Sequence, residues 1–123
     1  MSKPGKTGFE RIINAFGYSM KGLAATWTHE AAFRQEVALA IILLPTACWL
    51  ARTHVELILL VSSVFWVLMA ELANSSLEAV VDRTGSERHE LSGRAKDIGS
   101  ALVFVSLTLL AIVWAIIIFD RFG

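Results

Sequence analysis

The sequence predicts an all-α membrane protein, with an amphipathic N-terminal surface helix followed by three transmembrane helices. Of its 123 residues, 55% are hydrophobic, and the mean hydropathy of +0.61 is too apolar for an ordinary soluble domain. The net charge of zero conceals a strong segregation of charge. Between Val37 and Ala70 the ionisable groups besides Cys48 are confined to Arg52–Glu56, and Ile98–Phe119 contains none.

Residues 9–27 form the expected surface helix, after a loose basic lead-in over residues 1–8. Its apolar residues recur at helical spacing, at Phe9, Ile12, Ile13, Phe16, Met20, Leu23 and Trp27. Glu10, Arg11, Asn14 and Lys21 lie off this stripe. Basic residues on one side and aromatic residues on the other favour a helix in the membrane interface over one docked on a neighbouring protein helix.

The three apolar segments define the expected spans, over about residues 31–51, 57–74 and 98–119. Thr28 is the expected N-cap of the first span, and Pro45 is expected to kink that helix without breaking it. The helix of the second span should continue to about Arg83, and Ser86–Leu91 should form a polar turn before the third helix.

Basic residues are unevenly distributed around these spans. The N-terminal segment and the second connection carry nearly all of them, namely Lys3, Lys6, Arg11, Lys21, Arg34, Arg83, Arg88, Arg94 and Lys96. The first connection has only Arg52, and the C-terminus only Arg121. The positive-inside rule therefore places the N-terminus and the second connection in the cytoplasm and the C-terminus outside.

The chain shows no secretory signal pattern, internal repeat or linker, so we expect one compact membrane domain over residues 1–123. Cys48 is the only cysteine and lies in an apolar run. An intramolecular disulfide is therefore impossible, and a thiol buried in the membrane is expected.

Polar residues extend from the second span into the second connection. Glu71, Asn74, Glu78 and Asp82 follow at spacings of three, four and four, which places them within an arc of roughly 80° on one helix face. Like charges at such spacings repel, and carboxylates near a bilayer are costly to desolvate. This face therefore predicts a compensating cation: a metal ion, a basic partner segment, or protons on the carboxyls.

Carboxylates beside basic residues are the parts that phosphoryl transfer needs. Carboxylate and amide oxygens suit Mg²⁺, while Arg88, Arg94 and Lys96 could neutralise phosphates. His89 could contact a nucleotide base or remain solvated, and Glu30 could form a simple surface ion pair with Arg34. No P-loop or protein-kinase signature occurs. The alternatives are a small ion or proton conductor lined by these carboxylates and, less favoured, a structural assembly factor.

Four segments together resemble the small prokaryotic diacylglycerol kinase family: EAAFRQE at 30–36, E-x-x-N-x-x-x-E-x-V-V-D within 71–82, GSERHELSGRAKDIGSA at 85–101, and GFERIINAFGYSMKGL at 8–23. The resemblance implies a three-span homotrimer with composite sites between subunits. It also implies Mg-ATP-dependent phosphorylation of diacylglycerol to phosphatidic acid at the cytoplasmic face of the bacterial inner membrane, in lipid recycling. Related bacterial enzymes phosphorylate undecaprenol, which is the nearest alternative acceptor.

The resemblance also implies roles for individual residues. Glu71 would be the general base, Glu30 and Glu78 the metal ligands, and Asn74 an orienting residue. The implied ATP-binding residues are Arg11, Tyr18, Glu30, Glu78, Glu87, Arg88, His89, Lys96 and Asp97. The implied lipid-binding residues are Arg11, Ala15, Phe16, Gly17, Tyr18, Ser19, Met20, Ala24, Ala25, Thr26, Trp27, Ala32, Phe33, Arg34, Gln35, Glu36, Trp49, Leu50, Ala51, Arg52, Glu71 and Ser100. Met20 and Arg88 stand where the family usually has aromatic residues.

Overall fold

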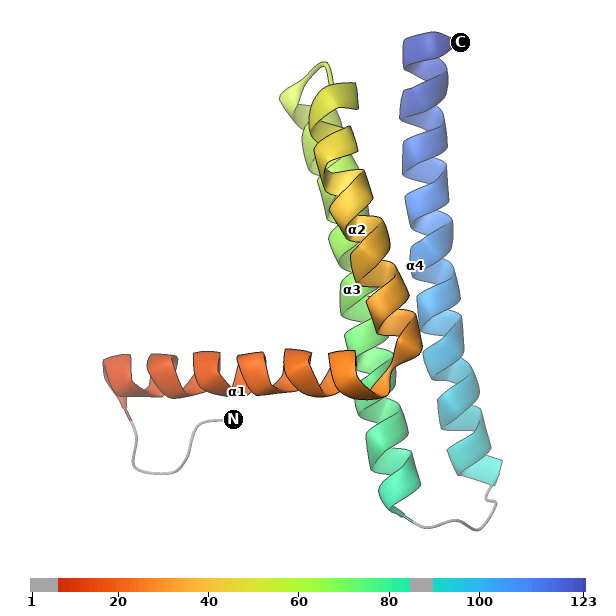
Figure 1. Cartoon of the computed structure of the whole chain (residues 1–123). Helices are drawn as coiled ribbons and strands as arrows, with labels where there is room; N and C mark the ends of the chain where they lie inside the picture. The colour runs from red at the N-terminus through yellow and green to blue at the C-terminus, as the bar shows by residue number, and fades with distance from the viewer. Residues whose placement is uncertain (1–6, 85–89) are drawn as a thin grey trace. The chain divides into compact units, whose positions relative to one another are not determined.

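The computed structural model describes residues 7–84 and 90–123, and within these ranges all regular structure is helical (Figure 1). The helices are α1 (Gly8–His29), α2 (Ala31–Leu50), α3 (His54–Arg83) and α4 (Glu90–Phe122). By length and composition α2, α3 and α4 could each cross a membrane. The all-α class and the three apolar spans are thus confirmed. The chain divides into one compact unit that ends at Ala31 and another that begins at Ala32.

The first unit is the single helix α1. Gly8 opens it with φ of +59°, a conformation that residues with a Cβ rarely adopt. The helix ends at His29, and Glu30 has an extended backbone with φ −121° and ψ 106°. Thr28 is therefore not an N-cap, so that prediction is wrong. Its hydroxyl instead donates to the Ala24 carbonyl at 2.9 Å within the last turns of α1.

The second unit is a bundle of α2, α3 and α4, which lie side by side (Figure 1). Its core contains Ala40, Ala47 and Leu50 from α2, Leu60 and Val64 from α3, and Trp114 and Ile117 from α4. Pro45 lies inside α2 without ending it, as expected for a membrane helix. These buried side chains form one cluster, so the three helices share one apolar core.

A short link over residues 51–53 connects α2 to α3. Thr53 is the N-cap of α3, and its side-chain oxygen accepts a hydrogen bond from the Glu56 amide at 3.1 Å. In return, the Glu56 carboxylate accepts from the Arg52 amide at 2.8 Å. These reciprocal bonds resemble a capping box. The bond from the Glu56 amide satisfies one of the donors that the helix start leaves without an intrahelical partner.

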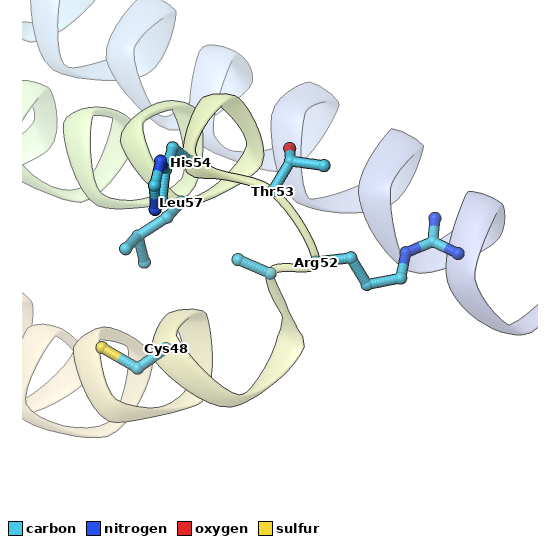
Figure 2. Close-up of a pocket in the computed structure, with 6 residues that line it drawn as sticks. Cys48, Arg52, Thr53, His54 and Leu57 are labelled. Carbon is cyan, nitrogen blue, oxygen red and sulfur yellow. The ribbon is translucent and has the colours of Figure 1, made fainter.

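A pocket lies between the end of α2 and the start of α3 (Figure 2). The Cys48 thiol, the His54 imidazole and Leu57 point into this space, whereas Arg52 extends away from it. Cys48 is exposed on the surface of the bundle, so its thiol is not part of the apolar core. The neighbouring residues Ala47 and Leu50 of α2 face the core, whereas Cys48 lines the pocket beside the link.

The C-terminal end of α4 is tied to the same link. The Arg52 guanidinium hydrogen-bonds the Asp120 carboxylate and lies 3.7 Å from Glu56. Arg121 donates to the Leu50 carbonyl at 3.4 Å, and its guanidinium carbon lies 5.3 Å from the centre of the Trp49 ring system. The charges at this end of the bundle are therefore satisfied by groups of the same chain.

Two helices also share a buried polar contact within the bundle. The Trp114 indole donates to the Ser63 hydroxyl at 3.1 Å, and that hydroxyl donates to the Leu60 carbonyl at 2.8 Å. Ser63 is only 1% exposed, so an unpaired indole or hydroxyl there would be costly. This contact fixes α4 against α3.

At the opposite end, α3 extends to Arg83 as expected. Helix α4 already includes Glu90 and Leu91, so the predicted polar turn is wrong for these two residues. A glutamate in the first turn is favoured by the helix dipole, and Arg94 Nη2 lies 3.5 Å from the Glu90 carboxylate one turn later.

Candidate functional site

We use the term acidic face for Glu71, Asn74, Glu78 and Asp82, which all belong to α3. Exposure increases along this face. Glu71 and Asn74 are 4% and 9% exposed, Glu78 is half-buried, and the Asp82 side chain is 64% exposed. The acidic face therefore extends from the interior of the bundle to its open end, so a polar ligand arriving at that end would meet carboxylates at several depths.

Glu71 is the unusual member because a carboxylate is rarely buried in an apolar bundle. It follows the buried Ala70 at the level where α3 still packs against its neighbours. A carboxylate in such a place must be hydrogen-bonded, paired or protonated. Burial of a group that can gain or lose a proton is typical of a catalytic acid or base.

Asn74 lies one turn beyond Glu71. Its Oδ1 is buried and has no hydrogen-bond partner among residues 7–84 and 90–123. This oxygen faces Gly99 of α4, where an added Cβ would lie only 2.2 Å from it. A buried acceptor without a strong donor in the bundle is the kind of group that functional sites retain.

Lys96 of α4 reaches the exposed end of the acidic face. Its Nζ lies 2.8 Å from the Asp82 carboxylate. Lys96 precedes the apolar run that begins at Ile98. The hydrogen bond with Asp82, and then the charge of that carboxylate, raise the pKa of Lys96 above its ordinary value. With 45% of its side chain exposed, Lys96 could exchange this partner for a phosphate.

Several implied site residues thus lie in the same α3–α4 region: Glu71, Asn74, Glu78 and Lys96, with the exposed Asp97 and Ser100 beside them on α4. Glu87, Arg88 and His89 lie outside the described residues. Arg11, Tyr18 and Glu30 belong to the first unit. Within it Arg11 is exposed, and the Lys21 ammonium lies 6.0 Å from the centre of the Tyr18 ring.

The implied lipid-binding residues differ in exposure. In α1 most are exposed, including Phe16, Met20 and Trp27. In α2, Phe33 and Leu50 are 5% and 2% exposed, and Leu50 belongs to the apolar core of the bundle.

The carboxylates of one chain supply only some of the oxygen ligands that a magnesium ion needs. Glu71 and Glu78 are two turns apart, about 10 Å by helical rise, and the described residues contain no cluster of three His, Cys, Asp or Glu side chains that could hold a metal. Mg²⁺ commonly uses one or two carboxylates together with phosphate oxygens and water. The half-buried Glu78 suits that requirement.

Three apolar helices with a buried carboxylate and a cationic side chain at one end define a small helical membrane protein with a polar site at the end of its bundle. The family model described as "Prokaryotic diacylglycerol kinase" matches residues 17–118. The chain belongs to this prokaryotic diacylglycerol kinase family.

Curated relatives match over nearly their whole lengths. A protein named diacylglycerol kinase from Escherichia coli (strain K12) is 53% identical over 117 residues, which cover 95% of this chain and 96% of the relative. Proteins of the same name from Haemophilus influenzae and Pseudomonas aeruginosa are 52% and 47% identical, and their alignments cover 92% and 93% of this chain and 96% and 93% of the relatives. The resemblance noted from the motifs is thereby confirmed.

Proposed function

We propose that this chain phosphorylates the free hydroxyl of diacylglycerol to give phosphatidic acid, with ATP as phosphoryl donor. Family membership supports the activity. The main support for placing the site on α3 is the buried Glu71 carboxylate, which lies one turn from Asn74 on the acidic face.

In the proposed reaction, the diacylglycerol hydroxyl oxygen attacks the γ-phosphorus of ATP. A new bond forms between that oxygen and phosphorus, while the bond between the γ-phosphorus and the bridging oxygen breaks and ADP leaves with the electron pair. Glu71 accepts the hydroxyl proton. Because a carboxylate is a weak base for an alcohol, positioning and neutralisation of phosphate charge supply most of the rate.

Other residues bind and orient the substrates. Glu78, with Glu30, would hold Mg²⁺, which supplies charge neutralisation on the phosphates when bound. Lys96 would leave Asp82 to contact a phosphate, and Asn74 would orient the groups around Glu71. Asp97 and residues 87–89 would contribute to the nucleotide site.

We further propose that α1 lies in the membrane interface. None of its residues is buried, and its stripe of aromatic and aliphatic side chains is exposed, which suits insertion at headgroup depth. The distribution of basic residues supports a cytoplasmic N-terminus and α3–α4 connection, with the C-terminus outside, in the bacterial inner membrane. The family resemblance supports a homotrimer in which the Glu30 of one subunit can serve the Glu71 and Glu78 of another.

The test is transfer of labelled γ-phosphate from Mg-ATP to diacylglycerol in mixed micelles, with wild type compared with Glu78→Gln. We expect phosphatidic acid formation that requires Mg²⁺ and is lost in the variant. Asp120→Asn, the same kind of carboxyl-to-amide change at the other end of the bundle, is the matched control and should retain activity.

Parallel reactions separate the alternatives. If the protein phosphorylated undecaprenol but not diacylglycerol, the proposed lipid acceptor would be wrong, whereas the proposed site would stand. Failure of folded wild-type protein to phosphorylate either lipid would overturn the proposal. Nucleotide-independent ion flux in sealed vesicles would then favour the conductor interpretation.

A further inference from the structure

We propose that Gly99 is a positioning residue for this reaction, because its lack of a side chain fixes the Asn74 amide between α3 and α4. The inference rests on the proposed role of Asn74 in orienting the site. It assigns to Gly99 a task beyond general helix packing.

The first observation is steric. Gly99 is buried in α4, and a Cβ built on it would lie 2.2 Å from Asn74 Oδ1 and 3.3 Å from Asn74 Cγ. The first distance is far below van der Waals contact, and Asn74 is itself 9% exposed. With α4 on one side and α3 on the other, the amide can only avoid a Cβ by rotating away or by pushing the helices apart.

The second observation concerns the same oxygen. Asn74 Oδ1 has no conventional hydrogen-bond donor among the residues that the structure describes. An added Cβ would replace one of the two Cα hydrogens of Gly99 and would point toward this oxygen. That hydrogen therefore also points toward the oxygen, which is the arrangement of a weak Cα–H···O contact. Glycine thus provides both the space and a weakly polar surface for a buried amide.

The position of this contact links it to the site. Asn74 lies three residues after Glu71 and four before Glu78, on one face of α3. On α4, Gly99 lies three residues after Lys96, which pairs with Asp82 of α3. A displacement of Asn74 or a wider α3–α4 spacing would therefore disturb the base, the metal carboxylate and the lysine together.

A second glycine of α4 provides the matched control. A Cβ at Gly93 meets no heavy atom within 4 Å in the described part of the chain. Since alanine favours a helix over glycine, Gly93→Ala should fold at least as well as wild type. Gly99→Ala makes the same chemical change two turns later, where the space is occupied.

The kinetic test measures kcat and KM for ATP and diacylglycerol in mixed micelles. We expect Gly99→Ala to lower kcat about 10- to 100-fold, since small misplacements of catalytic groups act mainly on turnover. KM for ATP should rise less, because Glu78 and Lys96 are displaced but still present, and KM for diacylglycerol should change little. Gly93→Ala should remain within about twofold of wild type, because its added methyl group meets no neighbouring atom in the described part of the chain. Wild-type kcat in folded Gly99→Ala would overturn the inference.

A spectroscopic test observes Asn74 directly. The chain contains two asparagines, Asn14 and Asn74, so selective ¹⁵N-asparagine labelling gives two side-chain amide pairs. Gly99→Ala should shift the Asn74 pair and leave the Asn14 pair in place, and Gly93→Ala should shift neither. An unmoved Asn74 pair would contradict the contact.

A double variant separates this inference from general destabilisation. In Asn74→Ala the clashing atoms are gone, and the next atom, Leu77 Cδ1, lies at an ordinary 3.6 Å from the added Cβ. Gly99→Ala should therefore lower the thermal midpoint or prevent folding in wild type but not in Asn74→Ala. Equal damage in both backgrounds would overturn the inference.

The single variants distinguish the two proposals. Loss of activity in Asn74→Ala with full activity in Gly99→Ala would overturn the Gly99 inference alone. Full activity in both would remove the proposed catalytic role of Asn74 and, with it, the positioning role of Gly99.

Discussion

The two ends of the α2–α4 bundle differ in how deeply their polar groups are buried. At the α2–α3 link, Arg52 contacts both Glu56 and Asp120, and Arg121 contacts the Leu50 carbonyl and the face of Trp49. At the α3–α4 end, Lys96 pairs with the exposed Asp82. Glu71 and Asn74 are nevertheless buried there, and Asn74 Oδ1 has no partner among the described residues.

This difference shows how one small bundle separates stability from function. A closed set of ion pairs and ring contacts holds three helix ends together and leaves little charge for a ligand. Buried carboxyl and amide groups at the other end cost stability, and a protein retains them where they act on something else. The following predictions test whether the two ends can be altered independently.

The largest effect is expected from Glu71→Gln. The amide has nearly the same shape but cannot take the hydroxyl proton, so kcat should fall by about 10²- to 10⁴-fold, the usual contribution of a general base. ATP affinity, measured by equilibrium binding, should change little because Glu71 is deeper than the implied nucleotide residues. Unimpaired turnover would remove Glu71 from the base role.

An intermediate effect is expected from Lys96→Met, which should raise KM for ATP about tenfold because one charge-assisted contact to a phosphate is lost. Asp82→Asn breaks the same ion pair but keeps the cation, so its effect should be smaller. Equal losses in both variants would show that the pair, and not the lysine charge, is what matters.

The pH dependence of Lys96 follows from its raised pKa. Its charge, and the stability that its ion pair contributes, are fully present below the ordinary lysine pKa of 10.5. They are lost only as the pH rises through the higher value in the folded protein. Activity changes between about pH 6 and 9 therefore report groups other than Lys96.

The smallest effect is expected from Asp120→Asn at the closed end. Its partner Arg52 is 45% exposed and Asp120 is 65% exposed, so solvent screens the pair and its loss should cost less than about 1 kcal/mol of unfolding free energy. Thermal unfolding in detergent measures the cost, and kinase activity should remain within about twofold of wild type. A large loss of activity would mean that the two ends are coupled.

Hydropathy and periodicity were sufficient for the helices and for the shared face of Glu71, Asn74, Glu78 and Asp82, because both depend on local sequence spacing. The end of α1 was misplaced because Thr28 has two possible partners: an amide ahead of it or the Ala24 carbonyl four residues back. The sequence pattern does not decide between them. The start of α4 was misplaced because a polar, charged segment is compatible with either a turn or the first turn of a helix.

Contacts between distant residues were not predictable in the same way. The contact of Gly99 with Asn74 depends on the relative rotation of α3 and α4, which no local sequence pattern determines. The bond between Ser63 and Trp114 spans 51 positions. A serine within an apolar run indicates that a polar partner is needed, but the sequence spacing does not identify Trp114 as that partner.

The capped link at residues 51–53 also bears on how the protein enters the bilayer. Thr53 and Glu56 cap α3 through bonds within four residues, so this tip can form as soon as it has been synthesised. Arg52 and Glu56 lie within ion-pair distance, which leaves the tip nearly neutral in charge. In the orientation proposed above, a helical hairpin with such a tip would carry little net charge across the hydrocarbon, so α2 and α3 would be able to insert as a pair before α4 has been made.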